Sequence, residues 1–237
     1  MSSSQVSGRT VPSVAANTSL MAPWATRDGA QVGLTSLEAM VAAGYGFHAT
    51  VGAFSTPIVG GGAGTVLDLD QPEFLLSVPS GTAIKIIRAH IQLQTPLLAT
   101  DADESEAILV VDRTAAWAAD GTSTAETLFN MRTDNPVTST CTAASAFTAD
   151  MTSTLAADPV LGIELARSVI TGDVNGTPGF AALLTKHELL YEPKVPLIVV
   201  GPAMVLGYWG GTVATSGFGQ IQFIEYPSAF AGLISST

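Results

Sequence analysis

The chain has 237 residues, 47% of them hydrophobic, and a formal net charge of −11. This length and apolar content suffice for a sizeable core and fit a single large β domain. The nine Lys and Arg residues are scattered along the chain. Because phosphate binding needs clustered basic side chains, we expect no direct contact with nucleic acid.

The surface is expected to contain few charged side chains. Only 12% of the residues are charged, against a typical ~25%, and the only lysines are Lys85, Lys186 and Lys194. Ala, Thr, Ser, Gly and Gln must therefore form most of the surface. Such a surface loses little side-chain entropy on packing and suits a protein held in a large assembly. An ordinary extracellular or viral β protein is the alternative.

Three further classes are disfavoured by simple features. Cys141 is the only cysteine, so neither an intrachain disulfide nor a cysteine zinc site is possible, and its place in an alternating run predicts a small buried thiol. The first residues lack the charged-then-apolar layout of a secretory signal. The apolar stretch 196–209 is short for a membrane span and is broken by Gly201, Pro202 and Gly207.

Residues 1–44 are expected to form an extended arm. They are rich in Ser, Thr and Ala and show no strand alternation. Within them we predict a helix of about two turns that is capped by Thr35 or Ser36 and ends at Gly44. The arm is not polybasic, so if it binds anything we expect it to bind protein.

Residues 45–237 are expected to form one β domain. Runs with strand character follow one another through this region. In chain order they are residues 45–53, 66–69, 73–78, 83–94, 107–111, 127–132, 141–151, 160–170, 180–191, 197–200, 203–209 and 219–226. Residues 180–191 also fit a short helix, although we favour a strand.

The run 83–94 contains a change of parity. Ile84 and Ile86 are followed by Ile87, Ala89, Ile91 and Leu93. One extra residue flips the facing of a strand, so we predict a β-bulge between Ile86 and Ile87.

These runs predict an all-β fold. They show neither βαβ alternation nor a repeat period. We therefore expect an antiparallel two-sheet jelly-roll sandwich of about eight strands, preceded by the extended N-terminal arm. The three C-terminal runs, 197–200, 203–209 and 219–226, are expected to form one wall of it.

No catalytic, cofactor-binding or metal site is expected. The GGGAGT loop at 60–65 lacks the Lys-Ser/Thr of a phosphate-binding loop, and no G-x-S-x-G elbow is present. His48, His90 and His187 are each isolated, unlike the closely spaced ligands of a cupin-type metal site. Asp68 and Asp70 would share a strand face, which is a weak signal for a glycosidase.

Structural calcium remains an alternative at two loops. Residues 101–106 contain Asp101, Asp103, Glu104 and Glu106, and residues 173–176 read Asp-Val-Asn-Gly. Oxygen-rich flexible loops can hold Ca²⁺, but neither loop completes an EF-hand pattern. Solvated acidic turns are the simpler interpretation.

The aromatic residues suggest one further alternative, a platform for sugar rings. They are Trp24, Trp117, Trp209, Tyr45, Tyr191, Tyr208 and Tyr226. Aromatics in β proteins more often belong to the core or to subunit contacts. We therefore assign Tyr208, Trp209 and Phe223 to packing.

Three segments carry a resemblance to a known group. They are VPSGTAIKIIRAHIQL (78–93), LFNMRTDNPVTSTCTAASAF (128–147) and PLIVVGPAMVLGYWGGTVATSGFGQIQFIEY (196–226). They resemble segments of small virion structural proteins of tailed bacteriophages, in which a turn feeds a long strand, a Met-Arg-Thr-Asp stretch precedes a Cys/Thr/Ala strand, and a Gly-Pro hairpin closes the domain. The likeness covers residues 73–226.

The resemblance implies a non-enzymatic, virion-located jelly-roll protein that is often trimeric and packs against itself and other capsid proteins. The acidic body and non-basic arm favour a cement, decoration or head-fibre-base protein on the outside of a head. A shell-forming capsid protein and a carbohydrate- or receptor-binding β-sandwich remain alternatives.

Overall fold

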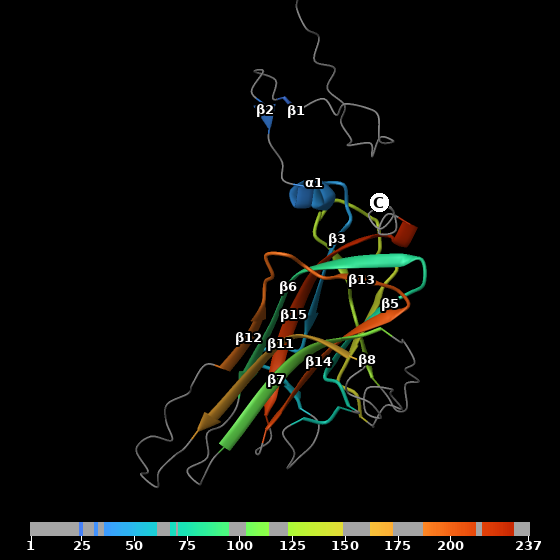
Figure 1. Ribbon diagram of the computed structural model, residues 1–237. Helices are drawn as coiled ribbons and strands as arrows, with labels where there is room; N and C mark the ends of the chain where they lie inside the picture. The colour runs from blue at the N-terminus through green and yellow to red at the C-terminus, as the bar shows by residue number, and fades with distance from the viewer. Residues whose placement is uncertain are drawn as a thin grey trace, which may run out of the picture.

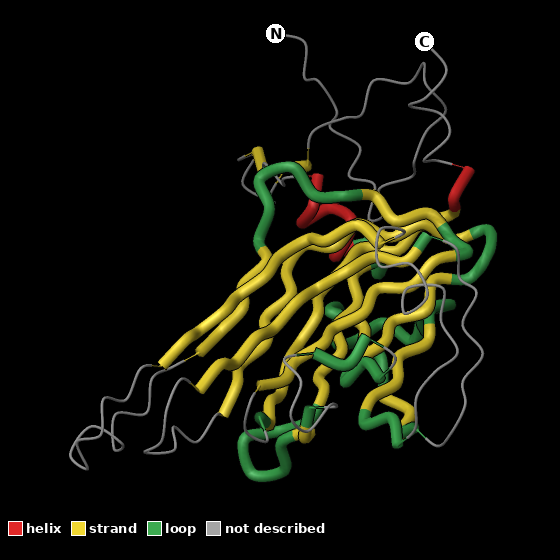
Figure 2. Tube along the Cα trace, turned by 60° about the horizontal axis from the view of Figure 1, so that its bottom comes forward, coloured by secondary structure: helices red, strands yellow, loops and turns green. Residues whose placement is uncertain are grey.

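The computed structural model of the protein describes residues 24–25, 31–32, 36–60, 67–69, 71–94, 103–113, 123–148, 162–172, 187–211 and 215–229. Within these residues two antiparallel sheets pack against each other, as Figures 1 and 2 show. The expected all-β, antiparallel two-sheet sandwich is confirmed. The two sheets contain more than the expected eight or so strands, because several short strands extend their edges.

One sheet has six described strands. Their order is β11 (Gly162–Gly172), β7 (Asp103–Asp112), β14 (Ala203–Gly211), β5 (Phe74–Val78), β10 (Thr142–Ser145) and β8 (Thr124–Glu126).

The other sheet has seven described strands. Its path runs through β12 (His187–Tyr191), β6 (Thr82–Gln94), β15 (Ser216–Pro227), β3 (Gly46–Val51) and β9 (Phe129–Asn130). Two short strands complete it: β13 (Ile198–Val200) pairs with β6, and β4 (Ile58–Val59) pairs with β15.

The described part of the N-terminal region contains a short ladder and a helix. Strands β1 (Trp24–Ala25) and β2 (Gln31–Val32) pair with each other, and α1 spans Ser36–Ala42. Figure 1 shows α1 above one end of the sandwich, where it contacts β3 and β15. The predicted helix is confirmed: its last residue is Ala42, and Gly44, where it was expected to stop, lies in the turn that closes it. Gly44 has a φ of +88°, a left-handed conformation that favours glycine.

The main core lies between the sheets and follows from strand alternation. Alternate residues of β3 (Phe47, Ala49, Val51) face alternate residues of the six-stranded sheet such as Leu76, Leu109 and Val205, and all are buried. A second buried cluster belongs to the other face of the six-stranded sheet and includes Leu75, Val110 and Leu206. Every residue of β14 is buried, so this strand contributes to both clusters.

The predicted bulge in β6 is confirmed. In the pairing of β15 with β6, Gln222 lies opposite Arg88 while Phe223 lies opposite Ile86, so Ile87 has no partner. Ile84 and Ile86 before the bulge, and Ile91 after it, are all buried. The extra residue keeps both halves of the strand facing the core.

The prediction that the three C-terminal runs form one wall is wrong. Strands β13 and β15 belong to the seven-stranded sheet, whereas β14 lies between β7 and β5 in the six-stranded sheet. The Gly201-Pro202 segment is therefore a crossing from one sheet to the other and not a hairpin. A Cβ on Gly201 would lie 2.0 Å from the carbonyl oxygen of Pro79, so the chain passes too close to that turn for any side chain.

Other expected elements change in extent. The supposed acidic loop 101–106 is strand from Asp103 onward, because β7 pairs with β11 along its whole length. Residues 67–69 are not strand, and Leu67 instead packs on the second cluster. The strand after Cys141 ends at Ser145, since Ala146 has a φ of +50°, although Phe147 is still buried.

Several expectations lie partly outside the described residues. Residues 187–191 form the expected strand β12, whereas 180–186 are not described. The same holds for most of the GGGAGT loop, for Asp70 and Asp101, for Trp117 and for residues 173–176.

Candidate functional site

The most extensive polar network in the described loops lies where the N-terminal helix meets the sandwich. Arg132, in the loop after β9, donates from Nη1 to the carbonyl oxygen of Ala42 at 2.9 Å. Its Nε and Nη2 donate to the two carboxylate oxygens of Asp134 at 2.7 and 3.2 Å. This hydrogen-bonded pairing raises the pKa of Arg132 and lowers that of Asp134. A cation at the last turn of a helix also complements the helix dipole.

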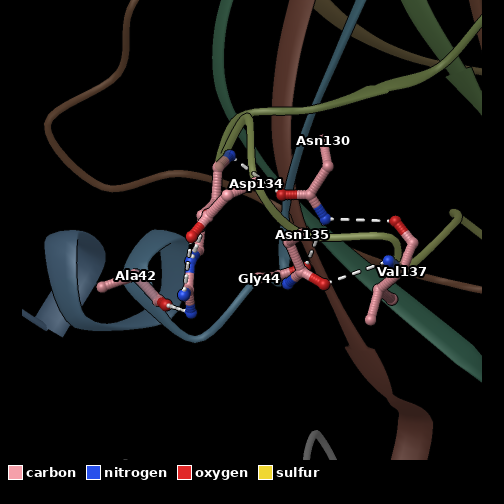
Figure 3. A network of polar contacts seen from close by, with 7 residues as sticks. Ala42, Gly44, Asn130, Asp134, Asn135 and Val137 are labelled. Carbon is pink, nitrogen blue, oxygen red and sulfur yellow. Dashed lines mark hydrogen bonds and ion pairs between the residues drawn. The ribbon is translucent and has the colours of Figure 1, made fainter.

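Two asparagines complete this network, which we call the helix clamp (Figure 3). Asn130 Nδ2 donates to the carbonyl oxygens of Gly44 and Val137 at 2.8 and 3.2 Å, and Asn130 Oδ1 accepts from the Arg132 amide at 2.9 Å. Asn135 Oδ1 accepts from the Val137 amide at 3.0 Å. A Cβ on Gly44 would lie 1.6 Å from Asn135 Nδ2, so the clamp leaves no room for a side chain there.

The end of α1 is closed by its own backbone as well. The Gly44 amide donates to the Val41 carbonyl and the Tyr45 amide to the Met40 carbonyl, at 2.9 and 3.0 Å, which is the Schellman arrangement. The next residue is already strand, and the Met131 amide donates to the carbonyl of Gly46 at 2.9 Å. Helix, clamp and strand therefore form one continuous hydrogen-bonded unit, which fixes where the chain before Ser36 enters the domain.

We expect Asn130→Ala to loosen the helix clamp. The substitution removes two donated bonds and one accepted bond, at a cost of about 1–2 kcal/mol in the free energy of unfolding. Amide exchange at Gly44 and Tyr45, followed by NMR or mass spectrometry, should accelerate more than exchange in β14. Thr133→Ala, at an exposed position of the same loop, is the matched control. Unchanged exchange in Asn130→Ala would contradict the role of the clamp.

The three histidines lie in three different settings. His48 Nε2 lies 3.3 Å from Thr50 Oγ1 on β3, and His90 Nε2 lies 3.0 Å from Glu188 Oε2, across from β6 to β12. Only His187 is buried. Among the residues that the structure describes, no three His, Cys, Asp or Glu side chains gather in a group that could hold a metal ion.

His187 joins the two sheets at one edge of the sandwich. It is 3% exposed, with Nε2 3.0 Å from Ser168 Oγ of β11 and Nδ1 3.2 Å from Ser105 Oγ of β7. Burial lowers the pKa of His187, and a hydrogen bond with Ser168 acts in the opposite direction. The neutral ring can donate to one hydroxyl and accept from the other, so it fastens β12 to both strands without charge.

We expect His187 to make the fold sensitive to mild acid. The folded chain takes up this proton at a lower pH than the unfolded chain, whose ordinary pKa is about 6.5, so stability should fall as the pH drops below that value. Between the two pKa values the loss is at most ~1.4 kcal/mol per pH unit. Urea unfolding between pH 7.5 and 5 should show a shallower loss in His187→Gln than in wild type. The control His48→Gln should follow the wild type, and parallel profiles for wild type and His187→Gln would refute the idea.

Glu106, Glu164 and Glu73 are engaged with a cation or with backbone. Glu106 pairs with Arg167, which also binds Glu164 at 2.8 Å. Glu73, 3% exposed, accepts from the Trp209 amide at 2.7 Å. Asp68 lies in a turn, where its carbonyl accepts from the Gln71 amide, so the expected shared strand face with Asp70 does not form at this residue.

The aromatic side chains that the structure describes separate into core and surface. Trp209, Tyr208 and Phe223 are at most 1% exposed, so the assignment of these three to packing is confirmed. Trp209 consequently cannot offer a face to a sugar ring. Tyr45 is 40% exposed, and Phe54 and Phe218 form an edge-to-face pair with centroids 6.4 Å apart.

The sequence predicts the helix of this site but not the helix clamp. In the sequence, Arg132 and Asp134 stand out only as members of a Met-Arg-Thr-Asp stretch. A usable signal exists in the spacing, because Asn, Arg and Asp at alternate positions 130, 132 and 134 are typical of a polar turn that bonds to backbone. The partner of that turn, the end of α1, lies about 90 residues earlier.

The comparisons with known proteins add no relative. No protein-family model, no curated protein and no solved structure matches the chain. Among the described residues, no helix has the length and apolar character needed to cross a membrane.

Proposed function

We propose that the protein is a non-enzymatic virion structural protein. In this proposal it acts as a capsid-associated cement, decoration or head-fibre-base protein, through packing against copies of itself and against other capsid proteins. It needs no cofactor and makes no direct contact with nucleic acid or membrane. The resemblance of residues 73–226 to tailed-phage virion proteins supplies the class, and it also favours a trimer.

The observation that carries the proposal is the helix clamp. Seven hydrogen bonds involve the side chains of Arg132, Asn130 and Asn135. Two of them reach the carbonyl oxygens of Ala42 and Gly44 at the end of α1, and the other five hold the loop itself in shape. A fixed entry point for an N-terminal arm is what a subunit needs if the arm is to reach a neighbour in a defined direction. The Met-Arg-Thr-Asp stretch, which belongs to the resemblance, forms part of this clamp.

The order of the strands supports the jelly-roll form of the sandwich. A jelly roll winds an antiparallel ribbon so that successive strands fall in opposite sheets. Strands β5, β6 and β7 alternate between the sheets in this way, and so do β13, β14 and β15. Strands β3 and β9 extend the seven-stranded sheet beyond β15.

The roles of the buried polar groups also fit a structural protein. His187 joins β12 to β7 and β11, and Glu73 holds the backbone of Trp209. Glu225 accepts from Ser139 and from both the amide and the hydroxyl of Thr140. Each of these groups bonds to another strand or loop of the domain, as a stiff building block requires.

Size-exclusion chromatography with light scattering, followed by negative-stain microscopy, tests the proposal. The full chain should form a defined homo-oligomer, expected to be a trimer. A chain lacking residues 1–34 retains the helix clamp, so it should keep the circular dichroism and melting temperature of the domain while its assembly weakens. A full chain that stays monomeric at all accessible concentrations would overturn the proposal. Full assembly of the shortened chain would overturn the role of the arm.

A further inference from the structure

The outer edge of the seven-stranded sheet is built from two short strands in line. β12 pairs with Ala89–Leu93 of β6, and β13 pairs with Ala83–Lys85 of the same strand. Residues 192–197 connect them and pass the bulge at Ile87. Beyond β12 and β13 no further strand follows within the described part of the chain. The inner face of β12 contacts β11 and β7 of the other sheet, whereas outward-facing side chains of this edge are exposed.

Four large apolar side chains are exposed along this edge. Leu190 is 48% exposed, Val195 88%, Ile198 41% and Val200 47%. We call these four residues the β12–β13 strip. Their partners on β6 run from Ala83 to His90, which at ~3.3 Å per residue makes the strip about 20 Å long. The other large exposed apolar residues that the structure describes are spread over several elements, so this edge holds the main concentration among them.

Two prolines limit the backbone hydrogen bonds that this edge can form with another strand. Pro193 and Pro196 have no amide donor, and both lie in the connection between β12 and β13. An uninterrupted edge strand invites open-ended addition of further strands, and prolines block it. The strip is therefore suited to a closed contact between side chains.

The charges on the connection are self-complementary. Glu192 and Lys194 flank Pro193, and both are exposed. Neither forms an ion pair with another described residue. If two copies meet edge to edge in antiparallel fashion about a two-fold axis at Pro193, Glu192 of each copy faces Lys194 of the other. An isologous contact requires such self-complementarity, and two-fold contacts are the commonest in homo-oligomers.

We propose that the β12–β13 strip is a two-fold contact with a second copy of this chain. The inference rests on the proposed function, since it names the surface through which subunits associate. The strip is smaller than the ~800 Å² per partner of a standard interface. A single contact is therefore weak, and it acts in an assembly where other contacts hold the copies close together. Where trimers form, this contact joins one trimer to the next.

Charge reversal tests the geometry of the contact. Glu192→Lys places like charges opposite each other twice, and so does Lys194→Glu, so each change should weaken association about tenfold in sedimentation velocity. The double variant Glu192→Lys/Lys194→Glu restores both pairs and should return association to the wild-type level. Val195→Glu should weaken association both in the wild type and in the double variant. Melting temperatures should stay unchanged, because all three side chains are exposed.

A cross-linking experiment detects the contact even when it is weak. Cys141 is buried, and burial together with the charge of Glu225 raises its pKa to about 12, so it should not react. Val195→Cys therefore supplies one reactive thiol per chain, which a short bismaleimide should join into a covalent dimer. Val59→Cys is the matched control, since Val59 is 64% exposed but lies on β4. Val195→Cys should cross-link at least tenfold faster.

The outcomes separate this inference from the proposed function. Oligomers that persist unchanged in the single reversals and in Val195→Glu would overturn the strip contact and leave the assembly role standing. Failure of the double variant to restore association would overturn the two-fold geometry and point to a different partner for the strip. Absence of oligomers in the wild type, together with equal cross-linking rates for Val195→Cys and Val59→Cys, would overturn both.

Discussion

Trp209→Ala is expected to lower the free energy of unfolding by about 3–5 kcal/mol, the range found when a large aromatic residue is removed from a core. Trp209 is 1% exposed and lies in the cluster between the sheets. Its Nε1 donates to the carbonyl oxygen of Ile58 at 3.1 Å, so the substitution also leaves that acceptor without its partner. Chemical unfolding measured by tryptophan-independent circular dichroism checks the value.

Trp209→Phe separates the contribution of the buried ring from that of the hydrogen bond to Ile58. Phenylalanine keeps most of the buried ring but not the N–H group, so a loss of about 1–2 kcal/mol is expected. If Trp209 stood in a sugar-binding platform, Trp209→Ala would weaken glycan binding and leave stability untouched. A variant with the wild-type unfolding midpoint would therefore contradict the assignment to the core.

Glu225→Ala is expected to cost about 2–4 kcal/mol, since hydrogen bonds to a buried charged group are among the stronger ones. Glu225 lies in β15 and is 8% exposed. Its Oε1 accepts from the Thr140 amide and hydroxyl at 3.0 and 2.7 Å, and its Oε2 accepts from Ser139 Oγ. Because residues 139–141 lead into β10 of the other sheet, this carboxylate ties the two sheets together.

Glu164→Ala is the matched control for Glu225→Ala. Glu164 is also a bonded glutamate, but its side chain is 46% exposed and binds Arg167 on the surface. Such pairs contribute at most about 1 kcal/mol. Equal unfolding midpoints for the two variants in urea would show that the Glu225 network does not stabilise the fold.

Much of the fold could be predicted because alternation is a local property. The parity change in residues 83–94 located the bulge at Ile87, and Gly44 marked the end of α1. The local sequence does not determine to which of the two sheets a strand belongs. Residues 203–209 read as the neighbour of 197–200, yet the chain crosses between the sheets at Gly201 and Pro202, and the two strands pair with β5 and β6 respectively.

The candidate site was predictable only in part for the same reason. The helix that begins at Ser36 could be predicted from a few neighbouring residues. The clamp depends on Arg132 and Asn130 meeting Ala42 and Gly44, whose positions in the chain are about 90 residues away. Side chains such as Glu225 and His187 look like ordinary surface residues in the sequence, and only their distant partners explain their burial.

Among the described strands, β14 and β15 are the last to be synthesised. β14 separates β7 from β5, and β15 separates β6 from β3, so both sheets have their central positions filled by the two C-terminal strands. At the usual 5–20 residues per second, a ribosome presents the flanking strands β3, β5, β6 and β7 several seconds before these two. Until β14 and β15 are present, β7 and β5 have no strand between them in one sheet, and β6 and β3 have none in the other. The emerging chain must therefore remain unassembled, and a translation product that stops before Ala203 has no route to the native sandwich.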